Sequence, residues 1–142
     1  MQNVWSAYGD AGVANNDVNG HGSHCAGSVG GRTFGVATCA NLYGVKVLSD
    51  TGSGSFANII GGLDFVLNRH LARGADAKTV VSMSLGGGCT NCANDPLVLK
   101  VGELTAAGIA VVVAAGNDGN DAGGHTPAAA VSALTIGASD IK

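Results

Sequence analysis

The sequence predicts an α/β fold, in which a parallel β-sheet is flanked by helices. Short apolar segments rich in β-branched residues alternate along the chain with longer segments whose apolar residues recur at helical spacing. Strands that alternate with helices are joined by right-handed crossovers, which make the strands parallel. The chain of 142 residues is long enough for one domain with a sizeable core. In such folds, ligands bind at the carboxyl ends of the strands.

The first part of the chain is expected to hold one helix and one strand. Residues 1–20 are polar and rich in Asn, Asp and Gly, which predicts an irregular lead-in. A helix is expected over residues 21–30, which begin directly after Gly20. Residues 41–48 are mostly apolar and rich in β-branched side chains, the pattern of a strand that is buried on both faces.

A second helix and a second strand are predicted in the middle of the chain. Residues 49–54 are rich in turn formers, and from Ser55 to about His70 the apolar residues repeat with helical spacing. Either Ser53 or Ser55 is suited to cap this helix. Residues 79–85 are predicted to form the next buried strand.

The last part of the chain repeats the alternation. A helix is predicted over residues 96–107, because Pro96 favours its first turn and Gly108 its C-terminal end. Residues 109–115 are predicted to form a third apolar strand, and residues 134–138 a short fourth one.

The composition argues against several classes of protein. The chain is 46% hydrophobic and 12% charged, and its 24 glycines follow no regular period, so it is neither disordered nor fibrous. The net charge is −3 and the seven Lys and Arg residues are scattered, which argues against a nucleic-acid or anionic-membrane partner. No run of apolar residues is long enough for a membrane span. Residues 1–5 lack the pattern of a signal peptide.

The four cysteines do not identify a cellular compartment. Cys25 lies in the first predicted helix and is expected to be unpaired, and Cys39 precedes a strand. Cys89 and Cys92 form a lone CxxC pair in a Gly-rich loop. This pair is expected to be either a local disulfide or two free thiols.

Two motifs far apart in the chain carry side chains that are suited to catalysis. His21 opens the stretch His-Gly-Ser-His-Cys-Ala-Gly, whose small residues allow a substrate to approach closely. Asn117 follows the third apolar strand in the stretch Ala-Ala-Gly-Asn, just past the carboxyl end of that strand. A histidine can act as a general base, and an Asn amide can donate a hydrogen bond to the oxygen that becomes negative during acyl transfer. We expect both side chains at the same rim of the sheet.

Together these motifs resemble those of the subtilisin-like serine proteases (subtilases, peptidase family S8), particularly the proteinase K branch. The likeness extends from about Asn19 to Asp140. It implies a three-layer subtilisin-like fold and serine endopeptidase activity on extended peptides. Residues 1–142 would be the central part of the peptidase domain, and secretion is expected by the same resemblance.

The resemblance also implies roles for individual residues. His21 matches the general base of the catalytic triad, and Asn117 matches the side-chain donor of the oxyanion hole. Two segments match those that hold an extended peptide as an added strand, and a third would line the pocket for the residue before the cleaved bond. These residues are Gly52, Ser53, Gly54, Ser84, Leu85 and Gly86 for the two segments, and Ala114, Ala115 and Gly116 for the pocket wall.

The chain departs from the family pattern at two of its catalytic positions. Asp10, in Asp-Ala-Gly-Val, imitates the motif of the triad acid, but it lies too close to His21 and no apolar strand precedes it in the sequence. The nucleophile motif Gly-Thr-Ser-Met-Ala is absent. Residues 1–142 therefore lack the strand of the triad Asp and the helix of the triad Ser, and we expect them to be nearly inert alone. An exposed sheet edge and apolar surface are also expected.

Other functions and cofactors remain open at this stage. His21, His24, Cys25, Cys89 and Cys92 are residue types that bind zinc, although one CxxC is only half of a typical structural site. A homologue that has lost catalysis and binds peptides is a second alternative. No cofactor is required, and the carbonyls of Val131 and Ala133 align with a family calcium site, so structural calcium is expected only in a longer protein. Cys25 resembles the free thiol beside the active-site histidine of the proteinase K branch.

Overall fold

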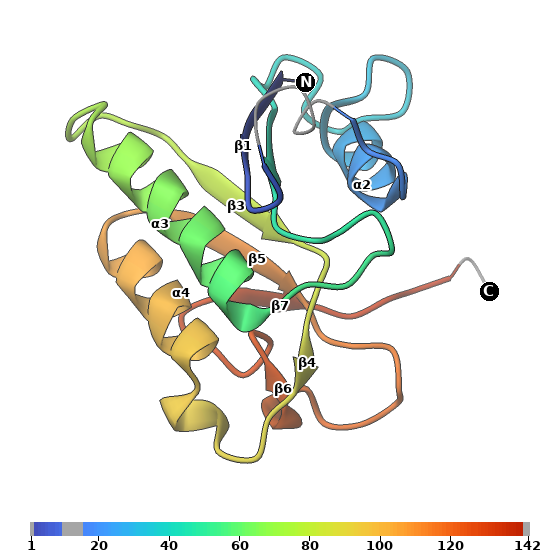
Figure 1. Ribbon diagram of the computed structural model, residues 1–142, viewed down its shortest axis with the longest axis vertical. Coiled ribbons are helices and arrows are strands. Elements are labelled where there is room, and N and C mark those ends of the chain that lie inside the picture. Colours follow the sequence, from blue (N-terminus) through green and yellow to red (C-terminus); the bar gives the residue numbers. More distant parts are fainter. Residues whose placement is uncertain (1, 10–15, 141–142) are drawn as a thin grey trace. The chain divides into compact units, whose positions relative to one another are not determined.

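The computed structural model describes residues 2–9 and 16–140 (Figure 1). The chain is mixed α/β and divides into two compact units, Met1–Phe65 and Val66–Lys142. A parallel sheet flanked by helices is present, so the predicted fold class is confirmed. The strands do not form one sheet, however: two parallel sheets and one antiparallel pair are found in the described part of the chain.

The first unit contains β1 (Gln2–Ser6), α2 (His21–Gly30), β2 (Tyr43–Lys46) and the first part of α3 (Phe56–Leu71). The strands β1 and β2 pair in parallel. The prediction of an irregular lead-in is therefore wrong for Gln2–Ser6. This segment has too few apolar residues to show a strand pattern, and its pairing with β2 decides its conformation.

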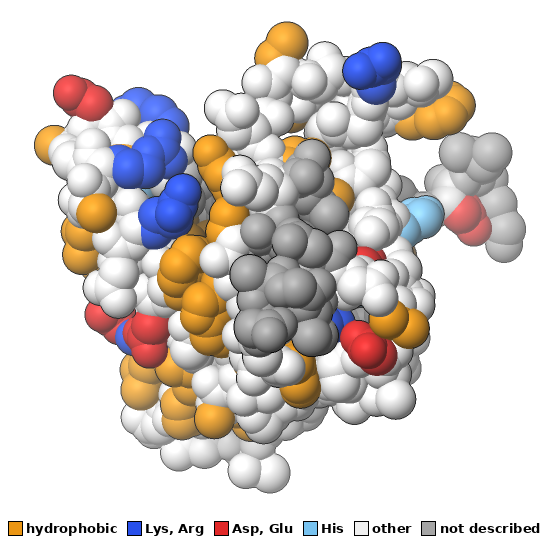
Figure 2. Space-filling view, turned by 45° about the horizontal axis from the view of Figure 1, so that its top comes forward, with side chains coloured by type: hydrophobic (Ala, Val, Ile, Leu, Met, Phe, Trp, Pro, Cys, Tyr) orange, Lys and Arg blue, Asp and Glu red, His pale blue; other side chains and the backbone are white. Residues whose placement is uncertain are grey.

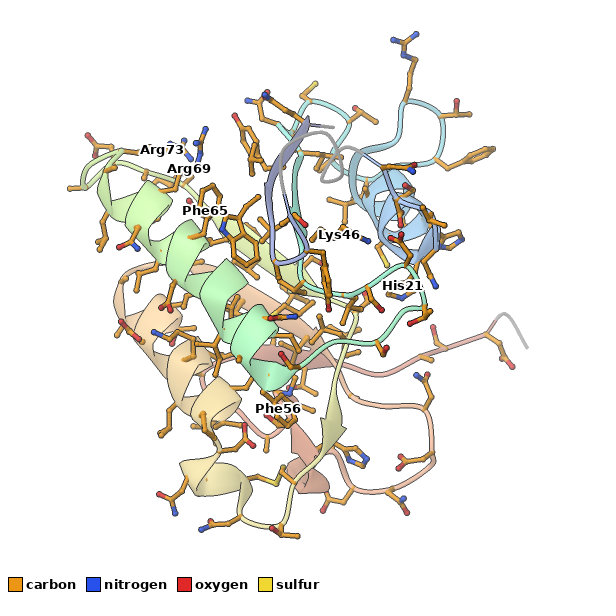
Figure 3. All side chains as sticks on the ribbon, viewed as in Figure 1. His21, Lys46, Phe56, Phe65, Arg69 and Arg73 are labelled. Atoms are coloured by element: carbon orange, nitrogen blue, oxygen red, sulfur yellow. A yellow bond between two sulfur atoms is a disulfide. The ribbon has the colours of Figure 1, made fainter. Side chains whose placement is uncertain are left out.

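The helix α3 packs closely on this pair of strands. Its N-terminus is capped by Ser55, whose hydroxyl accepts a hydrogen bond from the N–H of Asn58 at 3.1 Å. Of the two serines predicted as possible caps, Ser53 and Ser55, the structure thus selects Ser55. The rings of Trp5 in β1 and Phe65 in α3 stack with their centroids 6.2 Å apart (Phe65 is labelled in Figure 3). A Cβ atom at Gly62 would lie 2.5 Å from Val47 Cγ1, so only glycine allows this close approach of helix and strand.

The second unit is built on a three-stranded parallel sheet in the order β3-β5-β7 (Figure 1). Its elements follow the predicted sequence of strand, helix, strand and strand. They are β3 (Val80–Met83), β4 (Gly87–Gly88), the short 3-10 helix η1 (Cys92–Asn94), α4 (Pro96–Ala106), β5 (Ala110–Ala114), the 3-10 helix η2 (Ala122–Gly124), β6 (His125–Thr126) and β7 (Leu134–Ile136). The antiparallel pair β4–β6 was not predicted, because two-residue strands have no periodicity to detect.

The core of the second unit is made by α4 and β5. Leu97, Val101 and Leu104 of α4 are fully buried, as are Val111 and Val113 of β5. Asp95 caps α4 through hydrogen bonds from the N–H groups of Leu97 and Val98 to its Oδ1. The same oxygen accepts the buried hydroxyl of Thr126 at 2.6 Å, so one carboxylate connects the start of the helix to β6.

Part of the sheet surface is exposed, as expected. Leu134 and Ile136 of the end strand β7 are 62% and 56% exposed, and Val80 of β3 is 69% exposed, so β3 is not buried on both faces. On the face shown in Figure 2, hydrophobic side chains (orange) reach the surface at several places. None of the helices in the described residues is long and apolar enough to cross a membrane.

Candidate active site

His21 is the first residue of α2, as predicted (Figure 3). Asp17, which was not singled out from the sequence, holds the start of this helix. Its carboxylate accepts hydrogen bonds from the N–H of Ser23 at 2.8 Å, the hydroxyl of Ser23 at 2.7 Å and the N–H of Gly20 at 3.0 Å. These hydrogen bonds, with the Ser23 hydroxyl first, lower the pKa of Asp17. A carboxylate at this helix terminus also complements the helix dipole, and it fixes the backbone from which His21 projects.

Cys25 lies beside His21 on the same face of α2, as the spacing of four residues predicts. Its Sγ is 3.8 Å from Nε2 of His21, and it forms no disulfide. The thiol is half-buried rather than fully buried. One edge of the imidazole is therefore covered by sulfur.

The predicted peptide-binding segment Gly52–Gly54 lies in a compact loop after β2. Its backbone is partly used by the loop itself, because the N–H of Gly52 donates to Ser49 and the carbonyl of Ser53 accepts from the N–H of Ser49. The hydroxyl of Tyr8 lies 3.3 Å from this same carbonyl. The N–H of Gly52 and the carbonyl of Ser53 are therefore engaged within the loop itself.

The second unit contains a hollow of about 450 Å³ at the carboxyl ends of β3 and β5. Two predicted segments meet there, namely Ser84-Leu85-Gly86 on one side and Ala114, Gly116 and Asn117 on the other. Within the described chain, no backbone hydrogen bond joins residues 84–86 to another backbone group, so this wall has main-chain groups to offer. Gly87, Gly88, Asp118, His125 and Thr126 complete the lining.

Gly116 and Asn117 turn the chain away from β5 beside this hollow. Gly116 has a φ of 110°, a backbone conformation that residues with a Cβ rarely adopt, so the turn depends on glycine. Asn117 is exposed and follows directly, which leaves its amide available as a hydrogen-bond donor. Ala115, which was also predicted in the wall, donates its N–H to Ile136 and so continues the sheet.

Two ionisable side chains in the lining escaped the sequence analysis. His125 Nε2 lies 2.9 Å from Oδ2 of Asp118, and His125 Nδ1 lies 3.2 Å from the carbonyl oxygen of Asp121. The Asp121 carbonyl, followed by the Asp118 carboxylate, raises the pKa of His125. The side-chain amide of Asn120 is the main cause that lowers the pKa of Asp118. An Asp and a His seven residues apart in a Gly-rich stretch have no signal in the sequence other than that of a turn.

The structure brings the predicted residues of the second unit, except Ala115, together around one hollow. His21 and the segment Gly52–Gly54 belong to the first unit, so their convergence with Asn117 on one substrate stays a prediction. Asp10 lies outside the described residues. The wall of the hollow, formed by residues 84–86, 114, 116 and 117, is therefore the part of the proposed site that the structure defines best.

The structure also bears on two alternatives from the sequence, the state of Cys89 and Cys92 and the binding of zinc. Cys89 and Cys92 form a disulfide, so their sulfurs cannot serve as thiolate ligands of zinc. Among the described residues, no group of three or more His, Cys, Asp or Glu side chains could hold a metal ion. The two carbonyls of Val131 and Ala133 fall short of the roughly six to eight oxygen ligands that calcium takes.

A pocket formed by the loops at the carboxyl ends of parallel strands is typical of α/β enzymes. A sequence profile of the Subtilase family, peptidase family S8, matches residues 2–142. The alkaline serine protease ver112 of Corniculantispora psalliotae is 46% identical over 124 residues, which are 87% of this chain and 31% of that protein. Proteinase R of Parengyodontium album is 45% identical over 128 residues, which are 90% of this chain and 32% of that protein. The crystal structure of a cold-adapted subtilisin-like serine proteinase matches with a TM-score of 0.76 and 37% identity, covering 94% of this chain and 46% of that chain.

The chain belongs to the subtilase family. The resemblance to subtilisin-like serine proteases of the proteinase K branch, which the two motifs indicated, is confirmed. The chain spans about a third of the length of the curated relatives it matches.

Proposed function

We propose that residues 1–142 are the central part of a serine endopeptidase domain that binds extended peptides. The observation that carries the proposal is the hollow in the second unit, where the two predicted wall segments meet beside Asn117. Short side chains and unpaired backbone groups at residues 84–86 suit a peptide that adds as a strand. The residue before the cleaved bond would place its side chain in the hollow.

In this proposal His21 is the general base and Asn117 stabilises the transition state. His21 takes the proton from a serine hydroxyl, the serine oxygen attacks the scissile carbonyl, and the imidazolium then gives the proton to the leaving amine. The amide of Asn117 donates a hydrogen bond to the carbonyl oxygen as it becomes negative. The serine itself must come from a Gly-Thr-Ser-Met-Ala motif, which residues 1–142 do not contain, so these residues alone bind peptides without efficient hydrolysis.

The remaining parts of the proposal concern the environment of the enzyme. Its partners are peptides or proteins in extended conformation, and neither nucleic acid nor a membrane is needed for its chemistry. No step uses a cofactor or calcium. Secretion is proposed from the family resemblance alone.

The test is hydrolysis of a fluorogenic peptide by the protein expressed from the complete reading frame that contains these residues. In subtilisin, a relative of this protein, loss of the catalytic histidine costs on the order of a million-fold in turnover, and loss of the Asn donor about 10²–10³-fold. We expect losses of this order for His21→Ala and Asn117→Ala. His24→Ala is the matched control, because it removes the same side chain three residues further along α2. Equal turnover of the His21 and His24 variants would overturn the assigned roles.

A peptide-binding protein without catalysis is the second candidate, since the main-chain groups of residues 84–86 and the hollow beside them suit peptide binding without any nucleophile. The two candidates differ in a simple way. A reading frame with Asp-Thr-Gly upstream and Gly-Thr-Ser-Met-Ala downstream supports the enzyme. Peptide binding without hydrolysis by the complete product supports the binding protein.

A further inference from the structure

The hollow contains a pair of ionisable side chains that the proposed catalytic steps do not use. Asp118 and His125 both line it, and their side chains lie 2.9 Å apart. The His125 side chain is 18% exposed and that of Asp118 is 48% exposed, so the carboxylate is the more accessible of the two. A Cβ atom at Gly116 would lie 3.7 Å from the Asp118 carboxylate and 3.8 Å from the His125 ring, which places both beside the turn that carries Asn117.

Both nitrogens of the His125 ring have an oxygen atom within hydrogen-bond distance. Nε2 faces a carboxylate oxygen of Asp118, and Nδ1 faces the carbonyl oxygen of Asp121. Both of these oxygens only accept hydrogen bonds, whereas a neutral imidazole has a single N–H. The imidazolium therefore satisfies both contacts and the neutral ring satisfies one. While His125 is protonated, its charge cancels that of Asp118.

The other charged groups around the ring are also acidic. Asp121 lies at the start of η2 and caps this helix, because its carboxylate accepts a hydrogen bond from the N–H of Gly123. Asp95 binds the hydroxyl of Thr126, the residue next to His125. The loop of residues 84–88 on the opposite wall has no ionisable side chain. Among the described lining residues, His125 is thus the single group that can carry positive charge, and its loss of a proton leaves Asp118 uncompensated.

We propose that the His125–Asp118 pair sets the charge preference of this hollow for the substrate side chain that it takes. With the imidazole protonated, the hollow accepts neutral, apolar side chains. With the imidazole neutral, the Asp118 carboxylate favours the ammonium group of lysine or the guanidinium group of arginine. This inference rests on the proposed function, because it requires that the hollow receives a peptide side chain.

The experiment compares two peptides that differ in one charge. Both are acetylated and amidated, and they end in lysine or in norleucine, which has a similar aliphatic chain without the ammonium group. Binding to the protein is measured by NMR titration at pH 6 and pH 9, where lysine stays charged because its pKa is about 10.4. One unit charge about 4 Å away in water corresponds to a preference of roughly five-fold. We therefore expect the ratio of lysine to norleucine affinity to rise about five-fold from pH 6 to pH 9.

Three variants connect this change to the pair. His125→Gln keeps a hydrogen-bond donor for Asp118 but no charge, so the ratio should be high at both pH values. Asp118→Asn removes the attracting carboxylate, so at pH 9 its ratio should be about five-fold lower than that of the unmodified protein. Asp76→Asn is the matched control, because it removes an exposed carboxylate that does not line the hollow, and it should behave as the unmodified protein does. Amide spectra of each variant show whether it is folded.

The outcomes separate this inference from the proposed function. If both peptides bind with a ratio that does not change with pH, or if Asp118→Asn leaves the ratio at pH 9 unchanged, the inference is wrong and the peptide-binding function stands. If neither peptide binds, the proposed function fails and the inference fails with it. An NMR titration of the His125 ring gives a readout without peptide: its midpoint should fall in Asp118→Asn, and an unchanged midpoint contradicts the pairing.

Discussion

The contact of α3 with β2 can be tested by adding one methyl group at either of two adjacent glycines. Gly61 and Gly62 both lie inside the helix, so replacement by alanine gains about 1 kcal/mol of helix propensity at each position. The surroundings differ. A Cβ at Gly62 would lie 2.5 Å from Val47 Cγ1 and 3.0 Å from Val45 Cγ1, whereas a Cβ at Gly61 would meet only the Trp5 ring at 3.6 Å.

The magnitude follows from these distances. A methyl group in ordinary contact, as at Gly61, leaves the propensity gain intact, and Gly61→Ala should stabilise the protein by up to about 1 kcal/mol. At Gly62 the valine side chain is stiff at χ1 and must shift with its strand, and such overpacking costs typically about 1–3 kcal/mol. Gly62→Ala should therefore be less stable than Gly61→Ala by about 1–3 kcal/mol, because the propensity gain is common to both.

The assay is equilibrium unfolding in urea of the original protein and the two variants. Equal midpoints for the two variants, or a higher midpoint for Gly62→Ala, would refute the close packing of α3 on β2. The comparison also concerns the proposed site, because Val47 precedes the segment Gly52–Gly54, for which peptide binding is predicted, and the Val47 carbonyl lies 3.3 Å from the Tyr8 hydroxyl that also reaches Ser53.

Two further predictions concern the second unit. Asp95→Ala removes the cap of α4 and the partner of the buried Thr126 hydroxyl, so it should lower the free energy of unfolding by about 1–2 kcal/mol or more. Asp95→Asn should lose less stability, because asparagine still caps a helix. Urea unfolding measures both losses, and equal losses would contradict the capping role. The His125–Asp118 pair should make stability depend on pH. The pKa of His125 is raised from 6.5, so its contribution is complete below that pH and is lost as the pH rises through the folded-state pKa. The pKa of Asp118 is lowered from 3.8, so its contribution is present above that pH and is lost in stronger acid. The melting temperatures of the original protein and Asp118→Asn should therefore differ more at pH 5 than at pH 9, and the same difference at both would contradict the pairing.

The helices and the central strands could be predicted from the sequence because their signals are local. Residues 96–107 were expected to form a helix and α4 covers Pro96–Ala106, since Pro96, the buried face with Leu97, Val101 and Leu104, and Gly108 all lie within one segment. The apolar run before Gly116 likewise forms β5. The histidine and asparagine motifs indicated the family for the same reason, because each is a short continuous stretch.

Other parts of the structure depend on contacts that no local pattern records. The strand β1 forms because β2 offers it backbone partners, not because Gln2–Ser6 has a strand pattern. The capping carboxylate of Asp17 and the pairing of Asp118 with His125 arise in turns, where polar residues are common and spacing carries little information.

The sequence by itself determined the order of the helices α2, α3 and α4 and of the strands β2, β3, β5 and β7, the family, and the identity of the candidate base and amide donor, because periodicity and short motifs are properties of neighbouring residues. Only the tertiary structure decided that Ser84–Gly86, Asn117, Asp118 and His125 surround one hollow and that the imidazole of His125 lies 2.9 Å from the Asp118 carboxylate. The physical reason is that parallel strands bring their carboxyl ends to one edge, and the loops that follow them meet there whatever their separation in the chain.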